Sequence, residues 1–292
     1  ANVLRELLSR LELTNPFDQQ EIYEILDLCL SCKACKSECP SSVDMAKLKA
    51  EFLQHYYDSN RIPIRTRLIA YITSVNRLAS IVPGIYNWFI SNRFISFFIK
   101  RSIGFATKRS MPRLHKRTFQ KWLNRNLDEI NKSVANPKKT VYLFVDEFTN
   151  FNDVPTGIST IKTLTRLGYA VRIIKSAESG RTFISKGLIR KAKKLAIQNI
   201  TLYKNIITSD SPLIGIEPSA ILTFRDEYPD LAGSRLKKNA ESLAANVFII
   251  DEFLAREFEN GQISKDLFTE EKRMIKLHGH CQQKSVASTE PT

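Results

Sequence analysis

Four cysteines lie close together near the start of the chain, at a spacing that suits a metal cluster. The spacing is C-x2-C-x2-C-x3-C followed by a proline, and it is formed by Cys29, Cys32, Cys35, Cys39 and Pro40. Thiolates at this spacing bind the corners of a 4Fe-4S cluster, and in two-cluster ferredoxins the fourth cysteine of such a run ligates the other cluster. Since a cluster accepts electrons one at a time, the run predicts an electron-transfer site.

Zinc and disulfides account for the cysteines less well. Structural zinc sites usually take cysteines as two separated C-x2-C pairs, and a disulfide framework spreads its cysteines through a small secreted domain. Here Cys281 is the single cysteine outside the run, and no signal peptide opens the sequence. We therefore expect a reducing compartment and a cytoplasmic protein. The missing initiator methionine and the tail at 286–292 suggest a fragment of a longer protein.

Helices are expected on both sides of the cysteine run. Pro16 and Asp18 would open the second helix, while Ser41, Ser42 and Asp44 are good capping residues for the third. The apolar residues recur at helical spacing in three groups. These are Leu4, Leu7, Leu8, Leu11 and Leu13; Ile22, Ile25, Leu26 and Leu28; and Met45, Leu48, Phe52 and Leu53. A cluster loop between helices is typical of an α-helical ferredoxin.

One segment carries the whole net charge of +14. No Asp or Glu occurs between Ser59 and Leu127, whereas fourteen of the 44 basic residues lie there. The other 30 bases (44 minus 14) balance the 30 acids. The fourteen are Arg61, Arg65, Arg67, Arg77, Arg93, Lys100, Arg101, Lys108, Arg109, Arg113, Lys116, Arg117, Lys121 and Arg125.

The basic segment reads as helices, broken at Pro63, at Pro83-Gly84 and at Pro112. Its interleaved aromatic and basic residues fit either a membrane-surface segment or a nucleic-acid patch. The simplest interpretation is a helical linker whose bases face solvent. No apolar run reaches the roughly 18 residues that a membrane span needs. Nucleic acid is not expected, because no groove-reading motif accompanies the charge.

After Asn136-Pro137 the pattern changes to strands alternating with helices. Helices are expected around Ile158, Ile161 and Leu164, with Gly168 as a stop, and from Lys186 to 199 and Ser219 to 225. Alternation of this kind predicts a parallel, Rossmann-like sheet covered on both faces. No G-x-G-x-x-G follows a strand, so no dinucleotide site is expected. The predicted strands are 140–145, 170–174, 213–216, 247–250 and 274–277.

Five stretches carry a resemblance to a known family. They are CLSCKACKSECP at 29–40, FVDEFTN at 144–150, ESGR with ISKG at 178–187, GIEPS at 215–219 and HGHC at 278–281. In this order they resemble the C-terminal part of long FAD-linked oxidases. Such proteins are similar to D-lactate and glycolate dehydrogenases, and to the iron–sulfur subunits of glycolate oxidase and anaerobic glycerol-3-phosphate dehydrogenase.

The resemblance implies a mixed fold in three parts. These are an α-helical ferredoxin-like 4Fe-4S region at 1–60, a basic helical linker at 61–135, and at 136–292 an α/β domain like the cysteine-rich domain named for Cys-Cys-Gly. It further implies an FAD, held in a preceding part or partner subunit, that oxidises a 2-hydroxy acid. The cluster would then pass electrons to a quinone or another carrier.

Several cysteines expected from the resemblance are absent. Glu147 stands where a cysteine often follows Val-Asp, 178–180 reads Glu-Ser-Gly in place of Cys-Cys-Gly, and Ala220 stands where cysteine is common. Carboxylates and hydroxyls are poor ligands for a soft iron–sulfur centre. A second cluster within 140–292 is therefore not expected, and this domain is predicted to serve for docking.

Two questions stay open at this point. His278, His280 and Cys281 could form a small metal site with Glu217, or they could simply be a packed strand end. As to function, the leading hypothesis is an electron-transfer module of a FAD-dependent 2-hydroxy-acid dehydrogenase, with no catalytic residue in this chain. The rival is a non-enzymatic, cluster-stabilised scaffold whose basic helices bind an acidic partner or a membrane surface.

Overall fold

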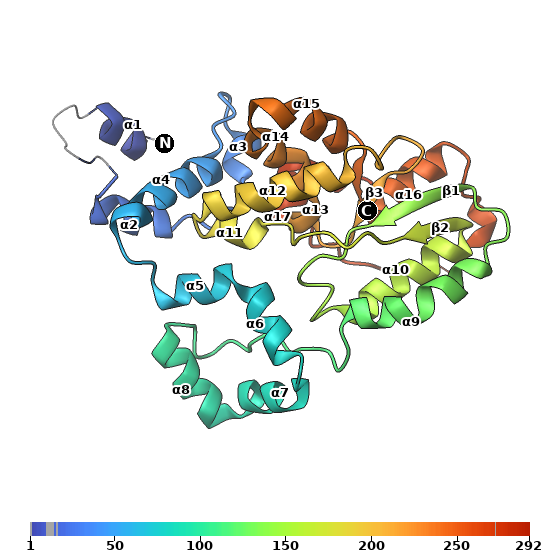
Figure 1. Cartoon of the computed structure of the whole chain (residues 1–292), viewed down its shortest axis with the longest axis horizontal. Coiled ribbons are helices and arrows are strands. Elements are labelled where there is room, and N and C mark those ends of the chain that lie inside the picture. The colour runs from blue at the N-terminus through green and yellow to red at the C-terminus, as the bar shows by residue number, and fades with distance from the viewer. Residues whose placement is uncertain (1, 10–14, 16, 272) are drawn as a thin grey trace.

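One parallel sheet and many helices make up the computed structural model, which describes residues 2–9, 15, 17–271 and 273–292 (Figure 1). Up to residue 138 the described elements are all helices, and the strands begin at Lys139. In chain order the elements are α1 (Asn2–Ser9), α2 (Gln20–Asp27), α3 (Ala34–Glu38), α4 (Met45–Ser59), α5 (Ile64–Ala70), α6 (Ile72–Ala79), α7 (Pro83–Ser91), α8 (Arg93–Ile103), α9 (Phe119–Lys132), β1 (Lys139–Leu143), α10 (Val154–Arg166), β2 (Tyr169–Arg172), α11 (Arg181–Ser185), α12 (Ile189–Tyr203), β3 (Leu213–Gly215), α13 (Pro218–Asp226), α14 (Tyr228–Leu231), α15 (Gly233–Ala244), β4 (Val247–Ile249), α16 (Ile250–Glu259), a 3-10 turn (Lys265–Leu267) and α17 (Cys281–Val286).

The sheet confirms the predicted parallel arrangement. Its order is β2-β1-β3-β4, and every neighbouring pair is parallel. Each strand ends one or two residues before its apolar run does, because the chain turns at the carboxyl edge or enters the next helix. At the last strand, for example, Ile250 already begins α16.

The fifth predicted strand is wrong. Residues 274–277 have no regular structure, and Met274 is 94% exposed. A short apolar run does not specify a strand by itself, since it needs a sheet edge to pair with. Here the run joins no edge of the sheet and leaves its side chains in solvent.

Two hydrophobic cores cover the two faces of the sheet. One core packs α9, α10 and α16 against β1 and β2, and the other packs α11 to α15 against β3 and β4. Leu213 belongs to the second core and its neighbour Ile214 to the first, as alternation along a strand requires. Ala50 of α4 and Ala70 of α5 join the second core, so N-terminal helices pack directly on the α/β part.

Helices form on both sides of the cysteine run as predicted, although Ile25 and Leu28 of the second apolar group are exposed. Asp44 caps α4 as expected, its side chain accepting hydrogen bonds from the backbone N–H groups of residues 46 and 47. Phe52 and Leu53 are buried, but Leu48 is exposed rather than on the buried face. The predicted positions Leu11, Leu13 and Pro16 lie outside the described residues.

The basic segment forms the short helices α5 to α8, which project from the sheet with α7 and α8 farthest from it (Figure 1). It ends in α9, whose Phe119 and Leu123 instead pack in the first core against the sheet. The breaks fall at the predicted prolines: Pro63 precedes α5, Pro83 is the first residue of α7, and Pro112 lies in a loop. Of the helices that the structure describes, none is long and apolar enough to cross a bilayer.

Candidate iron–sulfur site

The four cysteines lie on a short loop between α2 and α4. Cys29 follows the end of α2, Cys35 lies within α3, and Cys39 ends that helix. Ser31 and Lys33 have positive φ angles of 55° and 63°, so the chain reverses direction between successive cysteines. The sequence therefore forms the tight loop that the spacing predicts.

The thiols suit a cluster in their chemistry. None of the four is in a disulfide, and all are half-buried. Cys35 Sγ accepts a hydrogen bond from the Met45 backbone N–H at 3.3 Å. Backbone hydrogen bonds from residues 43, 41 and 42 lower the pKa of the Cys39 thiol, although its partial burial opposes this. N–H donors of this kind stabilise a thiolate, which is the form that binds iron.

The side chains do not converge on one point in this structure. Among the described residues, no group of three or more His, Cys, Asp or Glu side chains is placed to hold a metal ion. Donor type, spacing and loop shape fit a cluster, while side-chain convergence is not seen. Cluster binding at Cys29, Cys32, Cys35 and Cys39 thus stays a prediction.

A buried lysine fastens the loop to the α/β part. Lys33, between the second and third cysteines, is only 1% exposed. Its Nζ donates to an Asp226 carboxylate oxygen, and it lies 2.6 Å from Glu227 Oε1 and 3.5 Å from Asp44 Oδ2. We call Asp44, Asp226 and Glu227 the acidic socket. A lysine is almost never this buried unless it is paired, so the socket explains the position of the loop.

Two further lysines strengthen the socket from outside. Lys36 Nζ lies 2.6 Å from Asp226 Oδ1, and Lys47 Nζ lies 3.2 Å from the same oxygen and 2.6 Å from Asp230 Oδ2. Burial would raise the pKa of Asp226, but the charges of Lys33, Lys36 and Lys47 outweigh it and hold that pKa well below the usual range. Asp226 is therefore ionised.

The backbone of the loop is held from two other sides. Lys49 Nζ donates to the Cys29 carbonyl at 2.6 Å. From α17, Gln282 donates to the Ser31 carbonyl at 3.1 Å, and Ser285 donates to the Cys32 carbonyl at 3.4 Å. The loop is thus shaped by residues from α4, α13 and α17, which come from opposite ends of the chain.

Two positions where the resemblance expects cysteine meet inside the protein. Glu147, after β1, accepts hydrogen bonds from Ser179 Oγ at 2.5 Å and from the Ser179 backbone N–H at 3.2 Å. Both residues are buried. Burial raises the pKa of Glu147 to about 7, with the nearby Asp146 adding to the rise while the Ser179 hydrogen bond opposes it. The expected cluster ligands are thus replaced by a carboxyl–hydroxyl pair.

A chain of contacts links this pair to the socket. The Arg181 backbone N–H donates to Ser179 Oγ at 3.0 Å, and the Arg181 guanidinium donates to Glu227 Oε1. Glu227 in turn pairs with Lys33. Polar contacts therefore run without a break from the carboxyl edge of the sheet to the cysteine loop.

The possible second metal site is not formed. His280 Nε2 lies 3.6 Å from Glu217 Oε1, but His278 and Cys281 are exposed and complete no ligand set among the described residues. Glu217 instead caps α13 through the Ala220 backbone N–H at 2.6 Å. These residues form a helix cap and the start of α17, since the strand expected before them is absent.

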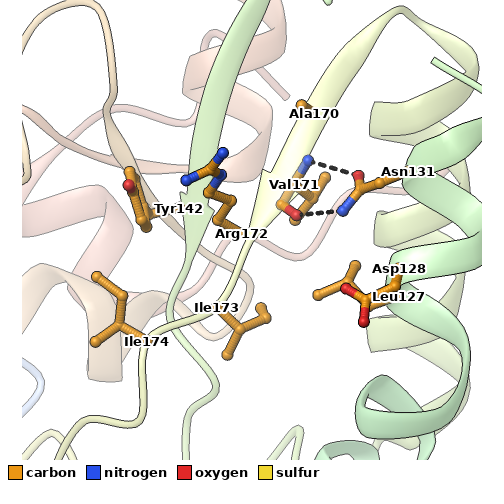
Figure 2. A pocket seen from close by; sticks show the side chains of 9 residues that line it. All are labelled: Leu127, Asp128, Asn131, Tyr142, Ala170, Val171, Arg172, Ile173 and Ile174. Atoms are coloured by element: carbon orange, nitrogen blue, oxygen red, sulfur yellow. Dashed lines mark hydrogen bonds between the residues drawn. The ribbon is translucent and has the colours of Figure 1, made fainter. Parts of the chain in front are cut away.

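A hollow lies elsewhere, between α9 and the edge strand β2 (Figure 2). Its volume is about 560 Å3, and its lining is mostly apolar. Asn131 on its wall donates to the Val171 carbonyl at 2.8 Å and accepts from the Val171 N–H at 3.0 Å. This side chain covers the open strand edge. Asp128 and Arg172 also line the hollow, but none of the predicted site residues does.

Comparison with known proteins gives a distant but consistent similarity. The chain is 27% identical over 243 residues to D-2-hydroxyglutarate dehydrogenase of Pantoea ananatis, covering 79% of this chain and 24% of that protein. The Escherichia coli enzyme of the same name is 25% identical over 268 residues, and the Pseudomonas putida enzyme is 26% identical over 222. These alignments cover 89% and 73% of this chain, and 25% and 22% of those proteins.

The chain thus spans about a quarter of the length of the curated relatives that it matches. No family model and no solved structure matches it. The named substrate of these relatives is itself a 2-hydroxy acid. The expected similarity to the class of 2-hydroxy-acid dehydrogenases is therefore confirmed.

Proposed function

We propose that the chain is the iron–sulfur electron-transfer part of a FAD-dependent 2-hydroxy-acid dehydrogenase. One observation carries the proposal: a C-x2-C-x2-C-x3-C-P run on a loop that a buried Lys33 fastens to the α/β part. The relatives support the chemical class, and D-2-hydroxyglutarate is the first substrate to test. The flavin would lie outside these residues, on a preceding part or a partner subunit.

Each part of the loop has a defined task in this scheme. Cys29, Cys32 and Cys35 would hold three corners of a 4Fe-4S cluster, and Cys39 would ligate a neighbouring cluster. When bound, the cluster supplies one-electron transfer between reduced flavin and a quinone or other carrier. The N–H donors to Cys35 and Cys39 stabilise negative charge on sulfur. No acid, base or nucleophile for substrate chemistry is assigned here.

Anaerobic reconstitution of the chain with ferrous iron and sulfide tests the proposal. We expect a brown protein with broad visible absorption, and loss of colour and bound iron in Cys32→Ser and in Cys35→Ser. The control is Cys281→Ser, which should keep its iron because Cys281 lies outside the run. Unchanged iron in both loop variants would mean that the loop binds no cluster.

A redox titration separates electron transfer from the scaffold alternative. An electron carrier should show a reversible one-electron signal by EPR. A cluster that cannot be reduced without losing its iron would instead indicate a structural cluster in a binding scaffold.

A further inference from the structure

Helices α7 and α8 expose aromatic side chains that nothing in the structure covers. Three apolar side chains on each helix, five aromatic and one isoleucine in all, recur at i, i+3 and i+4, so each set lies along one helix face. Trp88 is 58% exposed and Phe94 is 76% exposed. The six exposed residues are Ile85, Trp88, Phe89, Phe94, Phe97 and Phe98. Isolated exposed apolar residues are ordinary, but six on two adjoining helices form a surface.

The same helices are firmly folded through their other faces. Asn87 exchanges two hydrogen bonds with the backbone of Leu114, at 2.8 and 2.9 Å. Lys100 is buried and donates to the carbonyls of Thr107 and Arg109 at 2.7 and 2.9 Å. Both helices are therefore held in place by their opposite faces. Their exposed apolar faces are not the result of loose packing.

Charge indicates what kind of partner fits this face. Exposed bases lie near the apolar sets: Arg93 opens α8 and Arg101 lies in its last turn, while Arg77 of α6 and Lys108 after α8 flank the two helices in the sequence. No acidic residue occurs between 59 and 127. Aromatic side chains with flanking bases are the composition of helices that lie in the plane of a membrane. Each base near an anionic leaflet adds favourable electrostatic energy.

We propose that α7 and α8 dock on the surface of an anionic lipid bilayer. The aromatic face would enter the boundary between headgroups and acyl chains, and the bases would contact lipid phosphates. The segment would lie on the membrane without crossing it, in keeping with the absence of a spanning helix from the described residues. This contact does not depend on a bound cluster, so its test is independent of the proposed function.

Vesicle flotation with the 292-residue chain is the first test. We expect binding to vesicles of phosphatidylcholine mixed with phosphatidylglycerol at low salt, and much weaker binding to phosphatidylcholine alone. Raising the salt concentration should release the chain, because exposed charges are screened beyond about 10 Å at 0.1 M. Equal binding to both vesicle types, or no binding to either, would overturn the proposal.

Matched variants distinguish binding through this face from non-specific hydrophobic or electrostatic binding. Phe94→Ser with Phe98→Ser should weaken vesicle binding at least about tenfold, whereas Phe268→Ser, an exposed aromatic elsewhere, should not. Charge reversal of Arg93 and Arg101 to Glu should weaken it at least about tenfold as well. The same reversal at Lys237 and Lys238, exposed on α15, should have little effect.

Trp88 reports whether the face enters the lipid. The chain has two tryptophans, and Trp122→Phe leaves Trp88 as the single tryptophan, which can be excited selectively, away from the absorption of the tyrosines. Anionic vesicles should shift its emission to the blue, and brominated acyl chains should quench it. Vesicle binding without either change would mean contact through charge alone and would contradict insertion. Failure to bind vesicles, with capture by an acidic protein domain instead, would assign the face to a protein partner.

Discussion

Lys33 is the residue that joins the two chemical features of the protein, the cysteine loop and the sheet. It lies between two cysteines, yet its partners Asp226 and Glu227 come from the end of α13. Burying an ammonium group is very costly unless carboxylates surround it. The position of the loop is therefore set by charge pairing as well as by apolar packing.

Replacing Lys33 by methionine should strongly destabilise the fold. The substitution leaves Asp226 and Glu227 buried without their central cation, which typically costs about 3–5 kcal/mol. Lys36→Met is the matched control, because Lys36 pairs with the same Asp226 but is partly exposed. Its expected cost is about 1 kcal/mol. Urea denaturation of both variants measures the difference, and equal losses would show that the socket does not depend on Lys33.

Glu147 should make stability depend on pH. Its pKa is about 7 in the folded protein because it is buried, against about 4.3 in an unfolded chain. Between these values the folded state binds more protons, so the free energy of unfolding falls as the pH rises from about 4.3 to 7. The total loss is on the order of 3 kcal/mol. Asp226 has the opposite effect. Because its pKa is lowered in the folded protein, the free energy of unfolding falls when the pH drops into the acidic range and Asp226 is protonated.

Glu147→Gln tests this assignment, because glutamine keeps the shape and can still bond to Ser179. The decline in stability between pH 5 and pH 7.5 should become much smaller in this variant, and the exposed Glu241→Gln should leave it unchanged. Chemical denaturation at several pH values provides the measurement. A Glu147→Gln protein with the original pH profile would assign the decline to other groups.

The chemistry of the cysteines could be predicted from the sequence, whereas the residues that hold the cysteine loop in place could not. The run is a local pattern, readable from five residues. The socket joins Lys33 to Asp226 across 193 positions, and no spacing rule links them. The run holds two lysines, Lys33 and Lys36, and nothing in its pattern indicates which of them is buried. The Glu147–Ser179 contact also needed the structure, although both positions had been singled out as missing cysteines.

At the scale of elements, one glycine allows α4 to approach the α/β part. Gly187 has a φ of 72°, and a Cβ at this position would lie 2.1 Å from Leu53 Cβ of α4. Non-bonded carbon atoms do not come so close. The helix that follows the cysteine loop can therefore pack here only because residue 187 lacks a side chain.

Gly187→Ala should cost about 2–4 kcal/mol, since it combines a left-handed backbone with overpacking. Gly261→Ala isolates the backbone contribution, because Gly261 has a φ of 70° and open space around it. That control should lose about 1–2 kcal/mol. Thermal unfolding of the two variants decides the matter. A Gly187→Ala loss no greater than the control would mean that α4 shifts aside freely.

The sequence predicted secondary structure best where a whole apolar run belongs to one strand or one helix. The four strands were found, but 274–277 was wrong because apolar residues alone do not provide a partner strand. Helices α15 and α16 are not predicted, and neither are the short helices α3, α11, α14 and α17. Residues 247–250 read as one strand, yet Glu252 accepts the Ile249 backbone N–H at 3.1 Å and starts a helix at Ile250. A side-chain contact two residues further on decided this boundary.

At the scale of the molecule, the question is whether the cysteine run serves one cluster or two. Its spacing is that of two-cluster ferredoxins, in which the fourth cysteine binds the neighbouring cluster. We therefore expect this chain by itself to hold an oxygen-labile cluster with less than full iron, and a segment or subunit that carries a second such run to restore two clusters, roughly eight irons.

Cys39→Ser gives the sharpest test of this sharing. If Cys39 serves a neighbour, the variant should bind as much iron as the parent chain, while Cys35→Ser should lose it. Iron and sulfide analysis with EPR compares the two. Equal loss in both variants, together with a fully occupied four-iron cluster in the parent, would mean that Cys39 closes its own cluster.

The residues that hold the cysteine loop lie far from it along the chain, and this distance also sets an order of events during synthesis. When the ribosome has completed Pro40, all four thiols exist, but Asp226 and Glu227 are almost two hundred codons away, and Gln282 and Ser285 come later still. Until then the thiols sit on an unfastened loop that oxidants and stray metal ions can reach. Metal loading should consequently act on finished chains, and a nascent chain would need its cysteines protected until translation reaches α17.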